Sequence, residues 1–472
     1  MVVSLFDEVR GAEFGDKRLN MRIGKVIDEL GANPSLSIPG ATKARAEMEA
    51  AYRFFDNDKV SPEKILEPHV EATRRRISQS ELVLLVQDTT EIDLTRPDQQ
   101  VKGAGPMDSE VRRGAFFHPL KAFDSDGLPL GIAWHKRWAR DEIETSLTKD
   151  EKSQKRKQKP IEEKESVRWV EGLRAAREVA AACPETCCVC VADSEGDIYE
   201  LFSEPRDCHG VQVQLLVRAC QTRATTDQTN WLAKTRDTAC LYRCTVNVSR
   251  RRSNIAPDKQ GKRAQSRDTR LAEVEVRATT LTLRPPYRCD RKLPKVTVNV
   301  VLVEEVNPPE GCEPIQWLLV TTLPIDRPEQ VKLIVQAYCI RWQIEIFFRT
   351  LKSGCRIESR QFEELRRIEN CLALYSIIAW RIMYLCRLGR ECPELSCEVV
   401  FEPSEWKSVY MTVKRTDPPP TPPRLNEMIR MIASLGGYVI RKSTNPGTQT
   451  LWIGLQRVHD MSTAWTAFGP ES

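Results

Sequence analysis

The sequence predicts an α/β protein, and three observations lead to this fold class. Short apolar runs of strand length alternate with helix-like segments between residues 82 and 192, as in an α/β core. Residues 211–306 alternate apolar and polar side chains at period two, which is typical of antiparallel strands. Helical patterns flank this region in the 472-residue chain. An aromatic content of 7% and a mean hydropathy of −0.43 exclude both a membrane protein and a wholly disordered chain.

A basic helical unit is predicted at residues 1–75. Residues 41–55 are rich in the helix formers Ala, Glu and Arg, and Gly31 suits the position just after a helix end. The basic side chains of this unit are Lys17, Arg18, Arg22, Lys25, Lys43, Arg45 and Arg53.

The α/β core is expected at residues 76–390, with an antiparallel β-rich insertion at about 211–310. A third, mainly helical unit is expected at 391–472, where the proline-rich segment 418–423 cannot continue a helix. Within the core, strands are predicted at 82–87, 116–122, 130–134 and 187–192, and a helix at 166–182.

One long helix is predicted at residues 326–354, because Asp326 suits an N-cap and Gly354 a C-terminal stop. In a regular helix, about 60° of the circumference would hold four polar side chains, Tyr338, Arg341, Glu345 and Lys352. A separate apolar stripe would pack on the core, namely Ile340, Ile344, Phe347 and Leu351. Ordinary surface pairing of Arg341 with Glu345 is the alternative interpretation.

Two aspartates stand where predicted strands end, Asp88 after LVLLVQ and Asp193 after CCVCVA. Either one alone is typical of a turn or a helix N-cap. If Glu345 joins them at one end of a sheet, three carboxylates could hold two hard divalent cations about 4 Å apart. Such a pair neutralises a scissile phosphate, so phosphodiester chemistry is the functional hypothesis, with Arg341 and Lys352 gripping flanking phosphates.

The spacing of the four polar residues resembles the Y-(2)-R-(3)-E-(6)-K signature of the bacterial insertion-sequence transposases of family four. That family includes the transposase of the composite kanamycin-resistance transposon. Other segments resemble it in the same order along the chain: GDKRLNMRIGKV, GATKARAEMEAAYRFFDND, VQDTTEIDL, ADSEGDIYE and GGYVIRKSTNPGTQTLWIGLQRVHDMSTAW. The resemblance covers almost the whole sequence.

The resemblance implies an RNase H-like catalytic core with a β-rich insertion, and a DDE triad that binds two Mg²⁺ or Mn²⁺ ions. Carried over by position, the catalytic and metal-binding residues are Asp88, Asp193 and Glu345. The DNA-binding residues are Tyr338, Arg341, Lys352, Trp317, Arg18 and Arg53. Trp317 would stack on a flipped base, although a core tryptophan is an equal interpretation.

The resemblance also implies the reaction and the partners. We expect cut-and-paste transposition, in which strand cleavage, hairpin formation, hairpin opening and strand transfer follow one another. The partners are double-stranded DNA, as terminal inverted repeats and as target, and a second copy of the chain in a synaptic complex. The 1–75 unit would bind the DNA ends and the 391–472 unit would support dimerisation. The expected location is the bacterial cytoplasm, in association with the nucleoid.

Cysteine usage, charge and hydropathy add weaker expectations. Sixteen cysteines without an export signal predict free thiols rather than disulfides or structural zinc. The net charge is only +5, but basic runs at 74–76, 152–159 and 250–270 favour a polyanionic partner. The run at 152–159 has no counterpart in the resemblance. The apolar stretch 371–380 is about half the ~20 residues of a membrane span, so no membrane is expected.

Three other functions are open at this point. A metal-dependent nuclease on the same core would cleave DNA without joining it. A non-catalytic DNA-binding protein would act as an inhibitor of transposition. An ordinary cytosolic protein would carry these motifs by accident.

Overall fold

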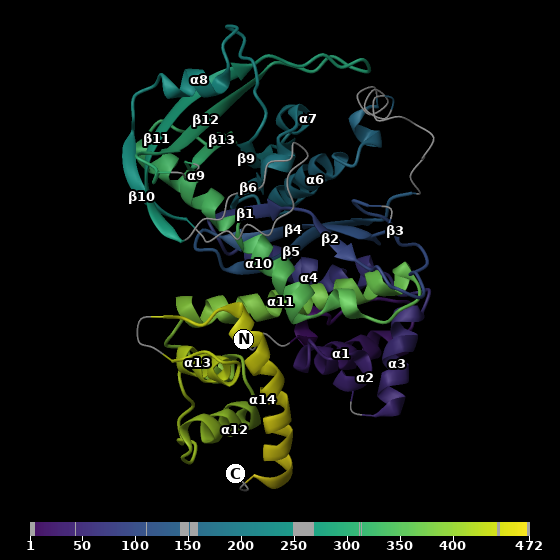
Figure 1. Ribbon diagram of the computed structural model, residues 1–472. Helices are drawn as coiled ribbons and strands as arrows, with labels where there is room; N and C mark the ends of the chain where they lie inside the picture. The colour runs from purple at the N-terminus through teal and green to yellow at the C-terminus, as the bar shows by residue number, and fades with distance from the viewer. Residues whose placement is uncertain are drawn as a thin grey trace. The chain divides into compact units, whose positions relative to one another are not determined.

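The computed structural model describes residues 5–42, 44–109, 111–141, 151, 159–248, 269–310, 312, 314–440 and 444–469 (Figure 1). The chain forms a mixed α/β fold, as the sequence predicts. It divides into two compact units. The first contains Met1–Ser146, Ala182–Thr186 and Trp342–Ser472, and the second contains Leu147–Ala181 and Cys187–Arg341.

The first unit begins with helices, as predicted for its basic N-terminal residues. A short 3₁₀ turn is followed by α1 (Lys17–Ala32), α2 (Ile38–Ala41), α3 (Arg45–Asp56) and α4 (Pro62–Ile77). Asp16 caps α1 by accepting the Arg18 N–H, and Ser61 caps α4 in the same way with Pro62 at the first helical position. Their apolar faces are buried, whereas Arg18 and Arg53 face solvent.

An antiparallel sheet follows in the first unit. Strand β4 (Arg113–Asp124) pairs with β1 (Leu82–Gln87), β2 (Thr90–Asp93), β3 (Gly105–Pro106) and β5 (Pro129–Trp138). Residues 83–87 of β1 are buried, which explains why its sequence is an uninterrupted apolar run. The register places Gln87, the last residue of β1, opposite Leu120 of β4. Asp88 therefore emerges beside the middle of the longest strand of this sheet.

The first unit also contains α11 (Leu365–Glu391), α12 (Pro403–Lys414), α13 (Leu425–Leu435) and α14 (Thr448–Phe468). Figure 1 shows α12, α13 and α14 side by side. Trp406, Met428 and Leu451 of these helices share one apolar core. α11 also contacts α3 and α4. By length and composition α11 could cross a membrane, but 83% of its most apolar window is buried inside the protein, as in the core helix of a globular domain.

The second unit holds a mixed sheet in the order β10-β11-β12-β13-β9-β6. β6 (Cys187–Ala192) is parallel to β9 (Gln214–Ala219), and the other neighbours are antiparallel. These are β13 (Gln316–Thr321), β12 (Val296–Glu305), β11 (Arg270–Leu283) and β10 (Tyr242–Val248). Helices α6 (Val167–Ala182), α7 (Tyr199–Ser203) and α8 (Trp231–Arg236) accompany the sheet. Strands β10, β11 and β12 lie where the period-two pattern predicts antiparallel pairing.

The prediction of one continuous helix at 326–354 is wrong. The chain forms α9 (Pro328–Ile340), α10 (Gln343–Arg349) and a π-helical turn (Thr350–Gly354). Between α9 and α10 the Arg341 N–H donates to the Tyr338 carbonyl and the Glu345 N–H to the Trp342 carbonyl, both at 3.2 Å. These i−3 bonds tighten the chain between α9 and α10. In the π turn, the Cys355 N–H donates to the Thr350 carbonyl, and this i−5 bond widens the helix there. The assumption of 100° per residue therefore fails across the segment, and the common face does not follow from spacing.

Candidate active site

Asp88 stands at the end of β1, as predicted, and is half-buried. Its Oδ1 accepts the Thr89 N–H at 2.7 Å. The Thr89 hydroxyl lies 2.8 Å from Nδ1 of His118, whose Nε2 lies 3.0 Å from Oε1 of Gln87. Gln87 and His118 are completely buried. The strand end that carries Asp88 is thus fixed by a polar network inside the sheet.

Asp193 follows β6 and caps a 3₁₀ turn, where its Oδ1 accepts the Glu195 N–H at 2.8 Å. Asp193 and Asp88 therefore both take the local turn role that was the alternative interpretation of each. A carboxylate has about four lone-pair sites on two oxygens, so a carboxylate that accepts a backbone N–H can still bind a metal ion. Both side chains are half-buried rather than enclosed.

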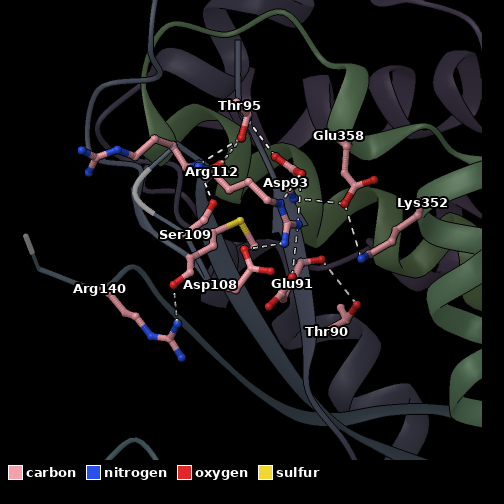
Figure 2. A network of polar contacts seen from close by, with 12 residues as sticks. Thr90, Glu91, Asp93, Thr95, Asp108, Ser109, Arg112, Arg140, Lys352 and Glu358 are labelled. Carbon is pink, nitrogen blue, oxygen red and sulfur yellow. Dashed lines mark hydrogen bonds and ion pairs between the residues drawn. The ribbon is translucent and has the colours of Figure 1, made fainter. Parts of the chain in front are cut away.

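Glu345 lies in the first turn of α10 and is half-buried, while its neighbours Ile344 and Phe347 are fully buried. The apolar stripe is thus largely as predicted. Lys352 lies in the π turn, and its Nζ is 3.4 Å from Oε1 of Glu358. Figure 2 shows Glu358 between Lys352 and the backbone of Asp93, at the end of β2.

Tyr338, Arg341 and Trp317 form a cluster in the second unit. The Trp317 and Tyr338 ring centroids are 5.8 Å apart, and the Arg341 guanidinium lies 5.6 Å from the Tyr338 ring. Tyr338 is 6% exposed and Arg341 7%, so neither is presented to solvent as the helical-face prediction required. Burial raises the pKa of Tyr338, although Arg341 and Arg218 oppose the shift. The burial of Tyr338 comes from tertiary packing, because Trp317 of β13 packs against its ring.

Trp317 itself is half-buried beside a small apolar cluster of Val248, Ala272 and Ile315. Its contacts fit the core interpretation, and they do not test the base-stacking role. The predicted DNA contact Arg53 is paired with Glu49 at 2.9 Å on the surface of α3, with 75% of its side chain exposed. Arg18 is exposed on α1.

The basic runs are only partly described. Arg76 of the first run is bound to the buried Glu8 carboxylate at 2.8 Å, so it stabilises the fold rather than facing a polyanion. Of the second run only Lys159 is described, and residues 152–158 lie outside the described residues, as do 249–268 and Lys43. At the end of the third run, Arg270 pairs with Glu305.

Three family models match the chain. The Transposase DDE domain matches residues 135–381, which is more than half of the chain. The chain belongs to the DDE transposase family. Transposase DNA-binding matches residues 5–60 of this DDE transposase, and the Transposase Tn5 dimerisation domain matches 377–465. A solved structure, the cryo-EM structure of the piggyBac transposase synaptic complex with hairpin DNA, is also similar: 10% identity, coverage of 83% of this chain and 69% of that one, and a TM-score of 0.35.

The family match establishes the class of enzyme. The protein is a DDE transposase that acts on phosphodiester bonds of DNA, binds DNA, forms dimers and depends on divalent metal ions. In the described part of the chain, no three His, Cys, Asp or Glu side chains form a group that could hold a metal ion. Oxygen donors such as Asp88 and Glu345 nevertheless match the ligand preference of Mg²⁺ and Mn²⁺. All sixteen cysteines lie in the described part of the chain, and none is paired in a disulfide there.

Two residues of this DDE transposase with structural roles, Asp197 and Glu358, are not predicted from the sequence. Asp197 is 4% exposed, accepts the Cys220 and Gln221 N–H groups at 2.7 Å each, and binds Nε of Arg223 at 2.9 Å. The motif ADSEGD contains it, but nothing in the motif separates its role from that of Asp193. Nothing in the sequence singles out Glu358, because the Asp93 N–H that its carboxylate accepts is 265 positions away.

Proposed function

We propose that this DDE transposase is a cut-and-paste enzyme of insertion-sequence family four, similar to the transposase of the composite kanamycin-resistance transposon. One observation carries the proposal: a DNA-binding segment, a DDE segment and a Tn5-type dimerisation segment follow one another in a chain that also has the Tyr338, Arg341, Glu345 and Lys352 spacing. If the four-residue spacing matched the family by chance, the DNA-binding and dimerisation segments would not be expected on either side of the DDE segment.

The proposed division of labour has three domains. Residues 1–75 bind the terminal inverted repeats, with Arg18 and Arg53 among the contacts. Residues 76–390 form an RNase H-like catalytic domain with a β-rich insertion at about 211–310. Residues 391–472 support the dimer within a synaptic complex. The matches at 5–60 and 377–465 favour this division. The enzyme would act in the bacterial cytoplasm, on the DNA of the nucleoid.

Asp88, Asp193 and Glu345 are the proposed catalytic triad, and together they would hold two Mg²⁺ or Mn²⁺ ions. When bound, such ions neutralise the charge that develops on the attacking and leaving oxygens. The support is that each carboxylate is half-buried on a rigid base, the two aspartates at the ends of buried strands and Glu345 on a core-packed helix.

The proposed reaction is a series of in-line phosphoryl transfers. Cleavage of one strand exposes a 3′-hydroxyl, which attacks the opposite strand and releases a hairpin. Water opens the hairpin, and the freed end joins target DNA. Lys352 and Arg341 would contact flanking phosphates with Tyr338, and Trp317 would stack on the base that leaves the helix during hairpin formation.

Alanine substitution of each triad residue tests the proposal. We expect Asp88→Ala, Asp193→Ala and Glu345→Ala to lower the strand-cleavage rate by about a thousandfold or more, because residues that act as a unit fail together. Binding to element-end DNA, measured by mobility shift, should change little. Asp98→Ala, which removes an exposed carboxylate, is the matched control. Normal cleavage by Glu345→Ala would rule out the triad.

A nuclease that cleaves without joining is the second candidate, because the same triad would serve it. Incubation of pre-cleaved element ends with a supercoiled plasmid distinguishes the two. Joined products are expected from a transposase. Cleavage of intact ends without any joined product would favour the nuclease.

A further inference from the structure

Glu358 makes two contacts with a single carboxylate oxygen. It lies in the 3₁₀ turn Ile357–Ser359, and its Oε1 accepts the Asp93 N–H at 3.0 Å. The same oxygen lies 3.4 Å from Nζ of Lys352 (Figure 2). Both side chains of this ion pair are about one-third exposed, at 30% and 29%. Glu358 therefore ties a lysine to a strand end.

These two partners connect the segments next to two proposed triad residues. Asp93 ends β2, which begins two residues after Asp88. Lys352 lies in the π turn that directly follows α10, the helix of Glu345. Glu358 thus connects β2, the strand after Asp88, with the π turn, which follows the helix of Glu345. All of these residues belong to the first unit.

The turn that carries Glu358 is itself held from several sides. Arg360 donates to the carbonyl of Pro34 at 2.7 Å and also to the carbonyls of Leu36 and Cys355. Arg356, just before the turn, has a left-handed φ of 50°, which a non-glycine residue adopts only where its surroundings enforce it. The Glu358 carboxylate therefore projects from a fixed backbone.

The neighbouring carboxylates on β2, Glu91 and Asp93, have a different cationic partner. Arg112 binds Asp93 at 3.0 Å, Glu91 at 3.2 Å and Asp108 at 2.8 Å (Figure 2). Glu358 is the carboxylate of this network that pairs with Lys352. Its negative charge is thus directed at the one side chain of the network that the proposed function assigns to DNA.

We propose that Glu358 is a positioning residue for strand cleavage, acting through Lys352; the proposal rests on the proposed role of Lys352 in DNA contact. Lysine carries its charge on a flexible stem, and its orientation must be fixed before a phosphate can be placed accurately. A partly exposed ion pair is weak enough to exchange with a phosphate. Glu358 therefore holds the ammonium near the end of β2, at the expense of some affinity for DNA.

Glu358→Gln separates positioning from folding, because the amide oxygen still accepts the Asp93 N–H while the charge is lost. We expect the single-turnover cleavage rate on bound element-end DNA to fall about tenfold. The dissociation constant for the same DNA should stay within about threefold of wild type or become tighter, because a negative charge leaves the phosphate path. A merely structural residue would weaken binding, cleavage and thermal stability together.

The matched control is Glu363→Gln, which removes the same charge from an exposed side chain five positions later. Rate and affinity should both match the wild type in that control. The double variant Lys352→Ala with Glu358→Gln should cleave no more slowly than Lys352→Ala alone, because Glu358 acts through the lysine.

The outcomes separate this proposal from the function on which it rests. If Lys352→Ala leaves DNA binding and cleavage normal, the assigned role of Lys352 fails. If Lys352→Ala is impaired but Glu358→Gln cleaves at the wild-type rate, or if the two losses multiply in the double variant, the positioning role of Glu358 is overturned.

Discussion

Lys121 shows how far a single residue can depart from expectation. It lies in the middle of β4 opposite Val86, and its side chain is completely buried. Its amine is 3.7 Å from the centroid of the Phe347 ring and has no hydrogen-bond partner among the described residues. Burial lowers the pKa of Lys121 well below its usual value. Burial therefore favours the neutral amine more than water does, which costs stability at pH values where the unfolded lysine is protonated.

Lys121→Met tests this cost at a nearly unchanged side-chain volume. An unfolded lysine keeps its proton up to about pH 10.4, whereas the folded one loses it at lower pH, so the wild type gains stability as pH rises. The variant should be more stable at pH 7 by about 2 kcal/mol, and its advantage should shrink by up to about 1.4 kcal/mol per pH unit as pH approaches 10.

Urea unfolding of both proteins from pH 7 to 10 measures the difference directly. The raised pKa of buried thiols such as Cys355 acts in the opposite direction above pH 9, but it is common to both proteins and cancels. A constant difference across the range would show that Lys121 titrates normally.

At the scale of elements, the core strands were predictable and the shape of the helical segment 326–354 was not. β1 and β6 are buried after their first residue, so each appears in the sequence as a short apolar run. The polar residue at which each run stops, Asp88 or Asp193, marks the end of the strand. The break at Arg341 and the π turn depend on i−3 and i−5 bonds that leave no periodic trace in the sequence. The burial of Tyr338 depends on Trp317, twenty-one positions earlier and in another element. The positions of these strands could thus be predicted from the sequence, whereas the burial of Tyr338 and Arg341 could not.

Arg360 joins the N-terminal helices to the residue that follows the π turn, Cys355. It is 4% exposed, donates to carbonyls between α1 and α2, and stacks 4.3 Å from the Tyr375 ring of α11. Arg360→Met should lower the free energy of unfolding by about 3 kcal/mol, because buried carbonyls would lose charged donors. Chemical denaturation measures this loss.

The control for Arg360 is Arg10→Met, which removes a surface ion pair with Asp7 from a side chain that is 68% exposed. Such pairs contribute at most about 1 kcal/mol. An equal effect of the two substitutions would mean that Arg360 does not tie these elements together.

At the scale of the whole molecule, one helix belongs to two functional segments. The DDE match ends at residue 381 and the dimerisation match begins at 377, both inside α11. α11 contacts α13 and α14 as well as the N-terminal helices α3 and α4. The C-terminal helices α13 and α14 therefore pack on the same helix as the N-terminal helices α3 and α4.

Gly454 is a point of close packing between α13 and α14. A Cβ at Gly454 of α14 would lie 1.9 Å from the Ile432 carbonyl oxygen of α13, so the two helices must separate to admit any side chain. Gly454→Ala should weaken self-association at least about tenfold, because overpacking commonly costs 1–3 kcal/mol. Sedimentation velocity measures the dimer, and mobility shift should show that single element ends are still bound.

Joined transposition products should fall with the dimer, because strand transfer in the proposed reaction needs two ends held by two copies. Gly447→Ala is the control, since a Cβ there meets nothing within 4 Å. If Gly454→Ala dimerises normally while its unfolding midpoint falls, the close contact of α13 and α14 serves only the fold. If instead both the dimer and the joined products disappear while DNA binding persists, assembly depends on the same helix contact that completes the C-terminal core.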